Sequence, residues 1–197
     1  MTGSELKTCL AAEKALYLGG NKKRAQRMKC AGEKRYCIWK YLYYFRLSQY
    51  YNILRLDRKN GALRRNAARL LFRVNVRKMN RFGARAGVEI SLASKIGVCL
   101  DIWHSGVVSN GTLGDRCVLH GNNVIGNKGK NGHDDTPVIG SGVDIGAGAI
   151  LIGAVRIADG CTVGAGAVVT RSCETPDSVL VGVPAKPIEK QQIHTED

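Results

Sequence analysis

The sequence predicts a chain of two parts, in which a basic α-helical region precedes a parallel β-helix. Before residue 88, apolar residues recur three and four places apart, and after residue 89 they recur every six. Charge divides at the same point: residues 1–88 contain 22 Lys and Arg against 4 Asp and Glu, whereas residues 89–197 contain 8 against 12. We therefore expect a helical region over 1–87, a β-helix over 88–183 and a C-terminal tail over 184–197.

Composition places the chain among soluble globular proteins, because 44% of its residues are hydrophobic, enough for a core. Charged residues interrupt the N-terminus, and uncharged apolar runs of spanning length are absent from the sequence, so we expect neither a secretory signal nor a spanning helix, and a cytoplasmic location. The seven cysteines are scattered singly without a C-x-x-C pair. We expect reduced thiols, several of them in the core, and no metal site.

The helical region contains two amphipathic, basic stretches, EKRYCIWKYLYYFRLSQYYNILRLDRK and GALRRNAARLLFRVNVRKM. Residues 19–35 between the helical pieces are expected to form a basic loop or a short helix. One interpretation packs the helices on each other and leaves Lys and Arg in solvent. A second places an aromatic, basic face of residues 35–80, with Trp39, Tyr41, Tyr43 and Tyr44, on an anionic membrane surface. Nucleic-acid binding is the least favoured, because no recognition motif accompanies the charge.

The β-helix is predicted from a six-residue repeat, since six is a multiple of two but not of 3.6. Counting in sixes gives only aliphatic residues: Ile139, Ile145, Leu151, Ile157, Val163 and Val169. Four places after each stands another small or medium apolar residue: Val143, Ala149, Val155, Cys161, Ala167 and Cys173. Upstream the same ladder runs through Ile90, Ile96 and Ile102, loses one residue near 108–112, and resumes at Leu113, Leu119 and Ile125.

Such units cannot bury their apolar side alone, so they stack into a solenoid. We expect three hexads to a coil and about five coils, with 127–137 (NKGKNGHDDTP) leaving the coil as a loop because it breaks the period with Gly, Asn, Asp and Pro. Periodicity does not fix the handedness.

Several motifs resemble the hexapeptide-repeat acyltransferases, most closely the serine acetyltransferase branch. They are VEISLASKIG (88–97), the histidine of DIWHSGVV, the run TPVIGSGVDIGAGAILIGAVRIADGCTVGAGAVVT (136–170) and VGVPAKPI (181–188). The helical region is similar to the lead-in of serine acetyltransferase-like proteins of polysaccharide gene clusters. The resemblance implies a left-handed parallel β-helix, a homotrimer, acetyl-CoA as donor, and active sites between neighbouring subunits.

By this resemblance His104 occupies the position of the catalytic histidine. Acyl transfer needs a base that removes the proton of the attacking hydroxyl, and imidazole suits that role at neutral pH. In the family an aspartate fifteen residues earlier orients the ring, and here that offset finds Glu89. Asp101 is a rival for the same role.

The resemblance also implies a donor site in the groove between two β-helices. Ala147 and Ala165 match the alanines whose backbone meets CoA, and Gly126 and Asn127 match the thioester end. Lys186 and Lys190, after the last coil, are expected to bind the phosphates of CoA, because the Lys ammonium is a compact positive charge.

The chain departs from the family pattern at the acceptor. Trp103 replaces an aspartate before the catalytic histidine, and Asp135 and Thr136 replace an Arg-His pair. The charged groups that would bind the amine and the carboxylate of an amino acid are therefore both missing. Trp103 suits the apolar face of a sugar, and Asp134 and Asp135 suit its hydroxyls.

We therefore predict a sugar or polysaccharide O-acetyltransferase whose basic helical region holds it near lipid-linked saccharides at the inner face of the plasma membrane. The first alternative is a serine O-acetyltransferase of cysteine biosynthesis. An alternative of another class is a non-catalytic trimeric scaffold with a membrane-surface arm.

Overall fold

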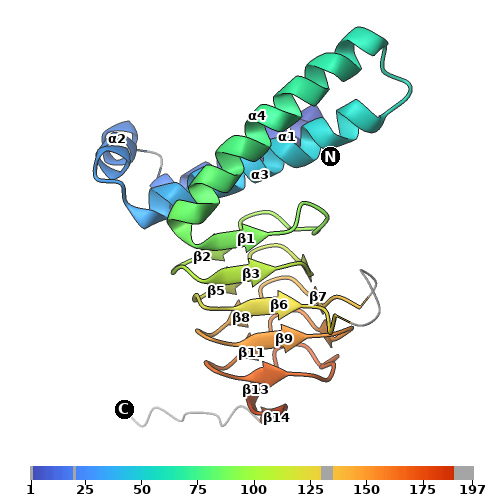
Figure 1. Cartoon of the computed structure of the whole chain (residues 1–197). Coiled ribbons are helices and arrows are strands. Elements are labelled where there is room, and N and C mark those ends of the chain that lie inside the picture. Colours follow the sequence, from blue (N-terminus) through green and yellow to red (C-terminus); the bar gives the residue numbers. More distant parts are fainter. Residues whose placement is uncertain (1, 20, 130–134, 189–197) are drawn as a thin grey trace.

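A computed structural model describes residues 2–19, 21–129 and 135–188, in which a helical region lies across one end of a stack of strands (Figure 1). Four helices come first: α1 (Gly3–Leu18), α2 (Lys22–Cys30), α3 (Lys34–Leu56) and α4 (Ala62–Ala86). Helix α2 shows that residues 19–35 contain a short helix, whose first turn is capped by the side chain of Asn21. None of the described helices is long and apolar enough to span a bilayer.

The strands cycle through three sheets in chain order, which makes the second part a parallel β-helix. The first sheet contains β1 (Val88–Ile90), β3 (Val107–Ser109), β6 (Val124–Gly126), β9 (Ile150–Ile152) and β12 (Val168–Val169). The second contains β4 (Thr112–Leu113), β7 (Val138–Ile139) and β10 (Arg156–Ile157). The third contains β2 (Asp101–Ile102), β5 (Val118–Leu119), β8 (Asp144–Ile145), β11 (Thr162–Val163), β13 (Val179–Gly182) and β14 (Ala185–Ile188).

The hexad residues fill the interior of this coil. Ile139, Ile145, Leu151, Ile157, Val163 and Val169 are all at most 3% exposed, as the six-residue period predicts. The ladder loses its residue earlier than predicted, because the buried residue after Ile102 is Val107 and the sixes resume from there through Leu113. The short step therefore falls at 103–106, in the turn that contains His104, rather than near 108–112.

The predicted loop and the predicted tail differ in structure. Of residues 127–137, those described, 127–129 and 135–137, lie outside the strands between β6 and β7. The predicted tail, by contrast, begins with β14, which pairs antiparallel with β13. Gly182 has a φ of 93°, which allows the chain to reverse after β13 so that β14 covers the sheet edge that β13 would otherwise expose.

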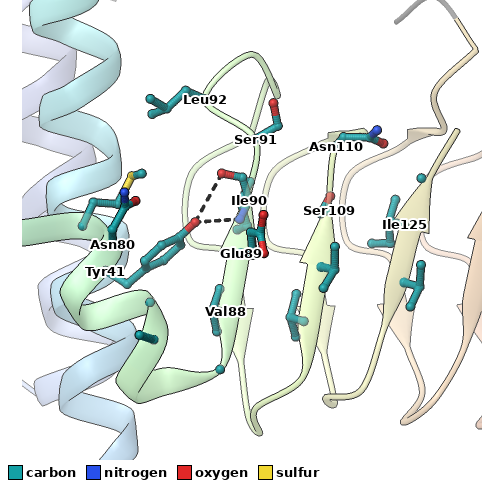
Figure 2. Close-up of a pocket in the computed structure, with 18 of the residues that line it drawn as sticks. Tyr41, Asn80, Val88, Glu89, Ile90, Ser91, Leu92, Ser109, Asn110 and Ile125 are labelled. Carbon is teal, nitrogen blue, oxygen red and sulfur yellow. Dashed lines mark hydrogen bonds between the residues drawn. The ribbon is translucent and has the colours of Figure 1, made fainter. Parts of the chain in front are cut away.

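The helical region is packed onto the first coil. The Tyr17 hydroxyl donates to the carbonyl of Leu100 (3.1 Å) and accepts from the amide of Ile102 (2.8 Å). The Tyr41 hydroxyl likewise accepts from the amide of Ile90 at 2.6 Å (Figure 2). These hydroxyls satisfy the backbone groups of β1 and β2 that no preceding coil pairs.

The aromatic face of α3 lies inside this junction. Trp39 is 8% exposed and Tyr41 2% exposed, and Tyr43 and Tyr44 are half-buried against the same core. The interpretation in which these four rings lie on a membrane is therefore wrong, and the helix-packing interpretation is correct for this face. The reason is that α3 packs against α1 and α4, and that Tyr41 bonds the first coil, so that this part of the helix is covered within one chain.

Candidate active site

His104 lies in the exposed turn that joins β2 to β3. The register of Ile102 with Leu119 places it over Gly121 of the next coil. A Cβ at Gly121 would lie 2.6 Å from that of His104, and Gly121 has a φ of 113°, so glycine is required there. Among the described residues, His104 makes no hydrogen bond or ion pair, which leaves its imidazole available to a ligand.

The same corner of the later coils contains the two alanines expected to meet CoA. The amide of Gly148 donates to the carbonyl of Gly121, and the amide of Gly166 donates to the carbonyl of Ala147, both at 2.9 Å. Ala147 and Ala165 are exposed on successive turns of this ladder. Strands in a sheet are about 4.8 Å apart, so His104 and Ala165, three coils apart, are about 14 Å from each other along one straight edge.

This edge is open beside the alanines. A Cβ at Gly166 would meet nothing within 4 Å, and one at Gly148 would meet only the amide of Gly166, at 4.0 Å. A narrow chain can therefore approach the backbone here, as the pantetheine arm of a CoA thioester requires. The corner fits the donor that the sequence predicts.

Trp103 and Asp101 form a network beside His104. The Trp103 Nε1 donates to Asp101 Oδ2 at 3.1 Å, and Asp101 Oδ1 lies 3.3 Å from a guanidinium nitrogen of Arg35. The Trp103 ring is 49% exposed and its centroid is 4.3 Å from that of His120. Asp101 therefore fixes the tryptophan and Arg35, and in the described chain it forms no hydrogen bond with the His104 ring.

Sequence reasoning missed the pair that supports this tryptophan. His120, directly after β5, has its Nε2 2.7 Å from Asp144 Oδ1 on β8. The pair holds the imidazole under the Trp103 ring. The sequence alone could not show this pair, because the Ile102–Leu119 register, which puts His120 next to Trp103 on the adjacent coil, is fixed only by the structure.

Glu89 lies in a different place, a groove of about 1030 Å³ between α4 and the outer face of the first sheet (Figure 2). Gly126 and Asn127 line the same groove, so three predicted site residues from distant parts of the chain meet there. Asn80 of α4 and Asn110 face it as well. Among the described residues, the lining contains one carboxylate, Glu89, and no Lys, Arg or His.

The single chain does not bring all the predicted residues together. No described contact joins Glu89 to His104, because Glu89 is in register with Val108, on the face beyond the turn. Asp135 is half-buried at the end of the loop, and Lys186 is exposed on β14, at the end of the β-helix far from the helices (Figure 1). Asp134 and Lys190 fall outside the described residues.

The cysteines behave as thiols of the interior. Cys9, Cys37, Cys117, Cys161 and Cys173 are buried, and all seven are unpaired. Burial raises the pKa of the Cys9 thiol to about 11 and also raises the pKa of Cys117, which disfavours thiolate at neutral pH. In the described part of the chain, no cluster of three His, Cys, Asp or Glu could hold a metal ion.

Comparisons with known proteins agree with this architecture. The chain matches no protein-family model and no curated protein sequence. Among solved structures, serine acetyltransferase from Neisseria gonorrhoeae superimposes with a TM-score of 0.66 and 27% identity over 95% of this chain and 68% of that chain. Its complex with serine superimposes with a TM-score of 0.65 and 26% identity over 95% of this chain and 70% of that chain.

The soybean serine acetyltransferase apoenzyme gives a TM-score of 0.64 and 26% identity over 94% of this chain and 69% of that chain. The superposition therefore includes the helical region as well as the β-helix. The chain has the fold of the serine acetyltransferases and is an acyltransferase enzyme.

Proposed function

We propose that the protein transfers an acetyl group from acetyl-CoA to an acceptor hydroxyl, with His104 as the general base. The observation that carries this proposal is the corner ladder, in which His104 and the exposed backbone of Ala147 and Ala165 share one straight edge. His104 removes the proton of the hydroxyl as its oxygen attacks the thioester carbonyl, and returns it to the leaving thiolate. Direct transfer needs no nucleophile on the enzyme.

The donor lies along this edge with its thioester at His104 and its nucleotide toward the last coil. There Lys186 is exposed on β14 and provides a point charge for phosphate. Gly121 keeps the edge free of a side chain beside His104. We propose this arrangement on the left-handed coil that the resemblance implies.

We further propose that the site is completed in a trimer. His104 has no described partner to orient its ring, and Glu89 lies in the groove of the first sheet without a described ion pair. When the corner of one subunit packs against the groove of its neighbour, the imidazole gains a carboxylate, and the acceptor is enclosed between them. Gly126 and Asn127 of that groove then lie near the thioester.

Two acceptors have separate support. The comparisons support L-serine better than a sugar, because the solved structures described above are serine acetyltransferases and one contains serine. The groove favours a sugar hydroxyl. Its described lining offers no cation for the serine carboxylate, and an unpaired charge in a site partly closed to water costs a few kcal/mol. Trp103, half exposed beside His104, provides a flat apolar surface for a sugar ring.

One experiment separates these candidates. Release of CoA from acetyl-CoA is measured with L-serine and with a panel of free and nucleotide-linked sugars, and the products are identified by mass spectrometry. Acetylation of any of these hydroxyls supports the enzyme, and the preferred substrate decides the acceptor. Failure of the protein to bind or hydrolyse acetyl-CoA at all would refute the proposal and favour a non-catalytic scaffold.

A further inference from the structure

Helix α4 has a second apolar stripe on the side away from α3. Its packed side contains Ala68, Asn75, Met79, Gly83 and Ala86, which are buried. Leu63, Ala67, Leu70 and Val74 follow one another at steps of four, three and four, so they share the opposite face. We call these four residues the outer stripe.

The outer stripe is open to solvent. Leu63 is 86% exposed, Leu70 64% and Val74 37%, and the adjacent Leu71 is 40% exposed. No described element of the chain covers them. Single exposed leucines are ordinary on a protein surface, but a continuous stripe over three helical turns indicates a surface that something else covers.

The charges around the stripe are of one sign. Helix α4 contains no Asp or Glu, and its cationic residues are Arg64, Arg65, Arg69, Arg73, Arg77, Lys78, Arg81 and Arg85. Helix α3 contains no acidic residue either. In the described structure none of the α4 cations forms a salt bridge with a carboxylate.

This charge decides which occupant fits. A second copy of α4 packed along the stripe would bring more arginines against these, with no carboxylate on either helix to pair them. An anionic surface supplies counter-charges for the cations that flank the stripe. Leu56 (63% exposed) and Leu63 flank the turn between α3 and α4, at the end of the hairpin that projects past the β-helix (Figure 1). A projecting, leucine-bearing, cationic end suits a bilayer interface.

We propose that the outer stripe of α4 lies on an anionic lipid surface. The leucines enter the boundary between headgroups and acyl chains, while the arginines extend to the lipid phosphates. This surface differs from the buried aromatic face of α3, and the proposal is independent of the acetyl acceptor.

The test is co-sedimentation of the full-length protein with vesicles of phosphatidylcholine alone or of phosphatidylcholine with phosphatidylglycerol. We expect binding to the anionic vesicles only. Raising NaCl from about 0.1 M to about 1 M shortens the Debye length from about 10 Å to about 3 Å and should release the protein. The variant Leu63→Ser/Leu70→Ser should partition at least tenfold more weakly at low salt.

The control is Val183→Ser/Ile188→Ser, which removes two exposed aliphatic side chains at the other end of the molecule and should bind like the wild type. Molar masses from light scattering accompany each variant. Equal binding to neutral vesicles, no binding to either kind, or wild-type binding by the leucine variant would overturn the proposal. A smaller assembly of the leucine variant would also overturn it, because the stripe would then lie between copies of the chain.

Discussion

The junction between the helices and the β-helix depends on one buried ion pair, and its removal should destabilise the protein strongly. Arg46 of α3 donates from Nε and from a terminal nitrogen to Glu13 Oε1 of α1, at 3.1 and 2.6 Å. The same guanidinium donates to the carbonyls of Ile96 and Gly97 in the first coil. The two side chains are 4% and 1% exposed, so neither charge is solvated.

Glu13→Gln keeps the size and one acceptor oxygen but leaves the guanidinium buried without a counter-charge. Breaking a buried pair in this way costs about 3–5 kcal/mol, and we expect about 3 kcal/mol here, because two backbone carbonyls still accept from Arg46. Since urea acts with a slope of roughly 1–3 kcal/mol per M, the unfolding midpoint should fall by about 1–3 M. Far-UV circular dichroism follows the transition.

The matched control is Glu33→Gln, which removes the same charge from an exposed position that makes no side-chain cap hydrogen bond at the start of α3. Its effect should stay below about 1 kcal/mol. An unfolding free energy for Glu13→Gln within about 1 kcal/mol of wild type, or equal losses in both variants, would show that the ion pair does not hold the junction.

Three further predictions concern the active site and the junction. His104→Ala should lower turnover about 10²-fold or more in the CoA-release assay while acetyl-CoA still binds; an unchanged rate would exclude it as the base. Trp103→Asp/Asp135→Arg/Thr136→His should raise activity with L-serine, by providing partners for the amine and carboxylate; no increase would remove the charge argument against serine. Burial raises the pKa of the Tyr41 phenol from 10.0 to about 12, so the unfolded state loses its proton first. The contribution of Tyr41 to the unfolding free energy should therefore fall by about 2 kcal/mol between pH 10 and pH 12, and the unfolding free energy of Tyr41→Phe should fall less over that range in urea titrations.

The sequence by itself determined the β-helix and the helical character of the first part. Hexad residues such as Ile145 and Val163 are buried wherever the six-residue period places them, because each coil meets only its neighbours and local spacing suffices to predict the inward side chains. Helices α3 and α4 follow from periodicity in the same way. The length of α2 and the strand β14 could not be predicted, since capping by Asn21 and the antiparallel return after Gly182 depend on individual turns.

Tertiary structure decided where the site residues meet. The resemblance implied that Glu89 orients His104, and within one chain the register puts Glu89 opposite Val108, in the groove under α4. Register likewise brought His120 onto Trp103, across seventeen positions of sequence. The packing of the helices also decided that the aromatic residues of α3 are buried while the leucines of α4 face outward. An amphipathic pattern alone does not tell which of two apolar faces finds a partner within the chain.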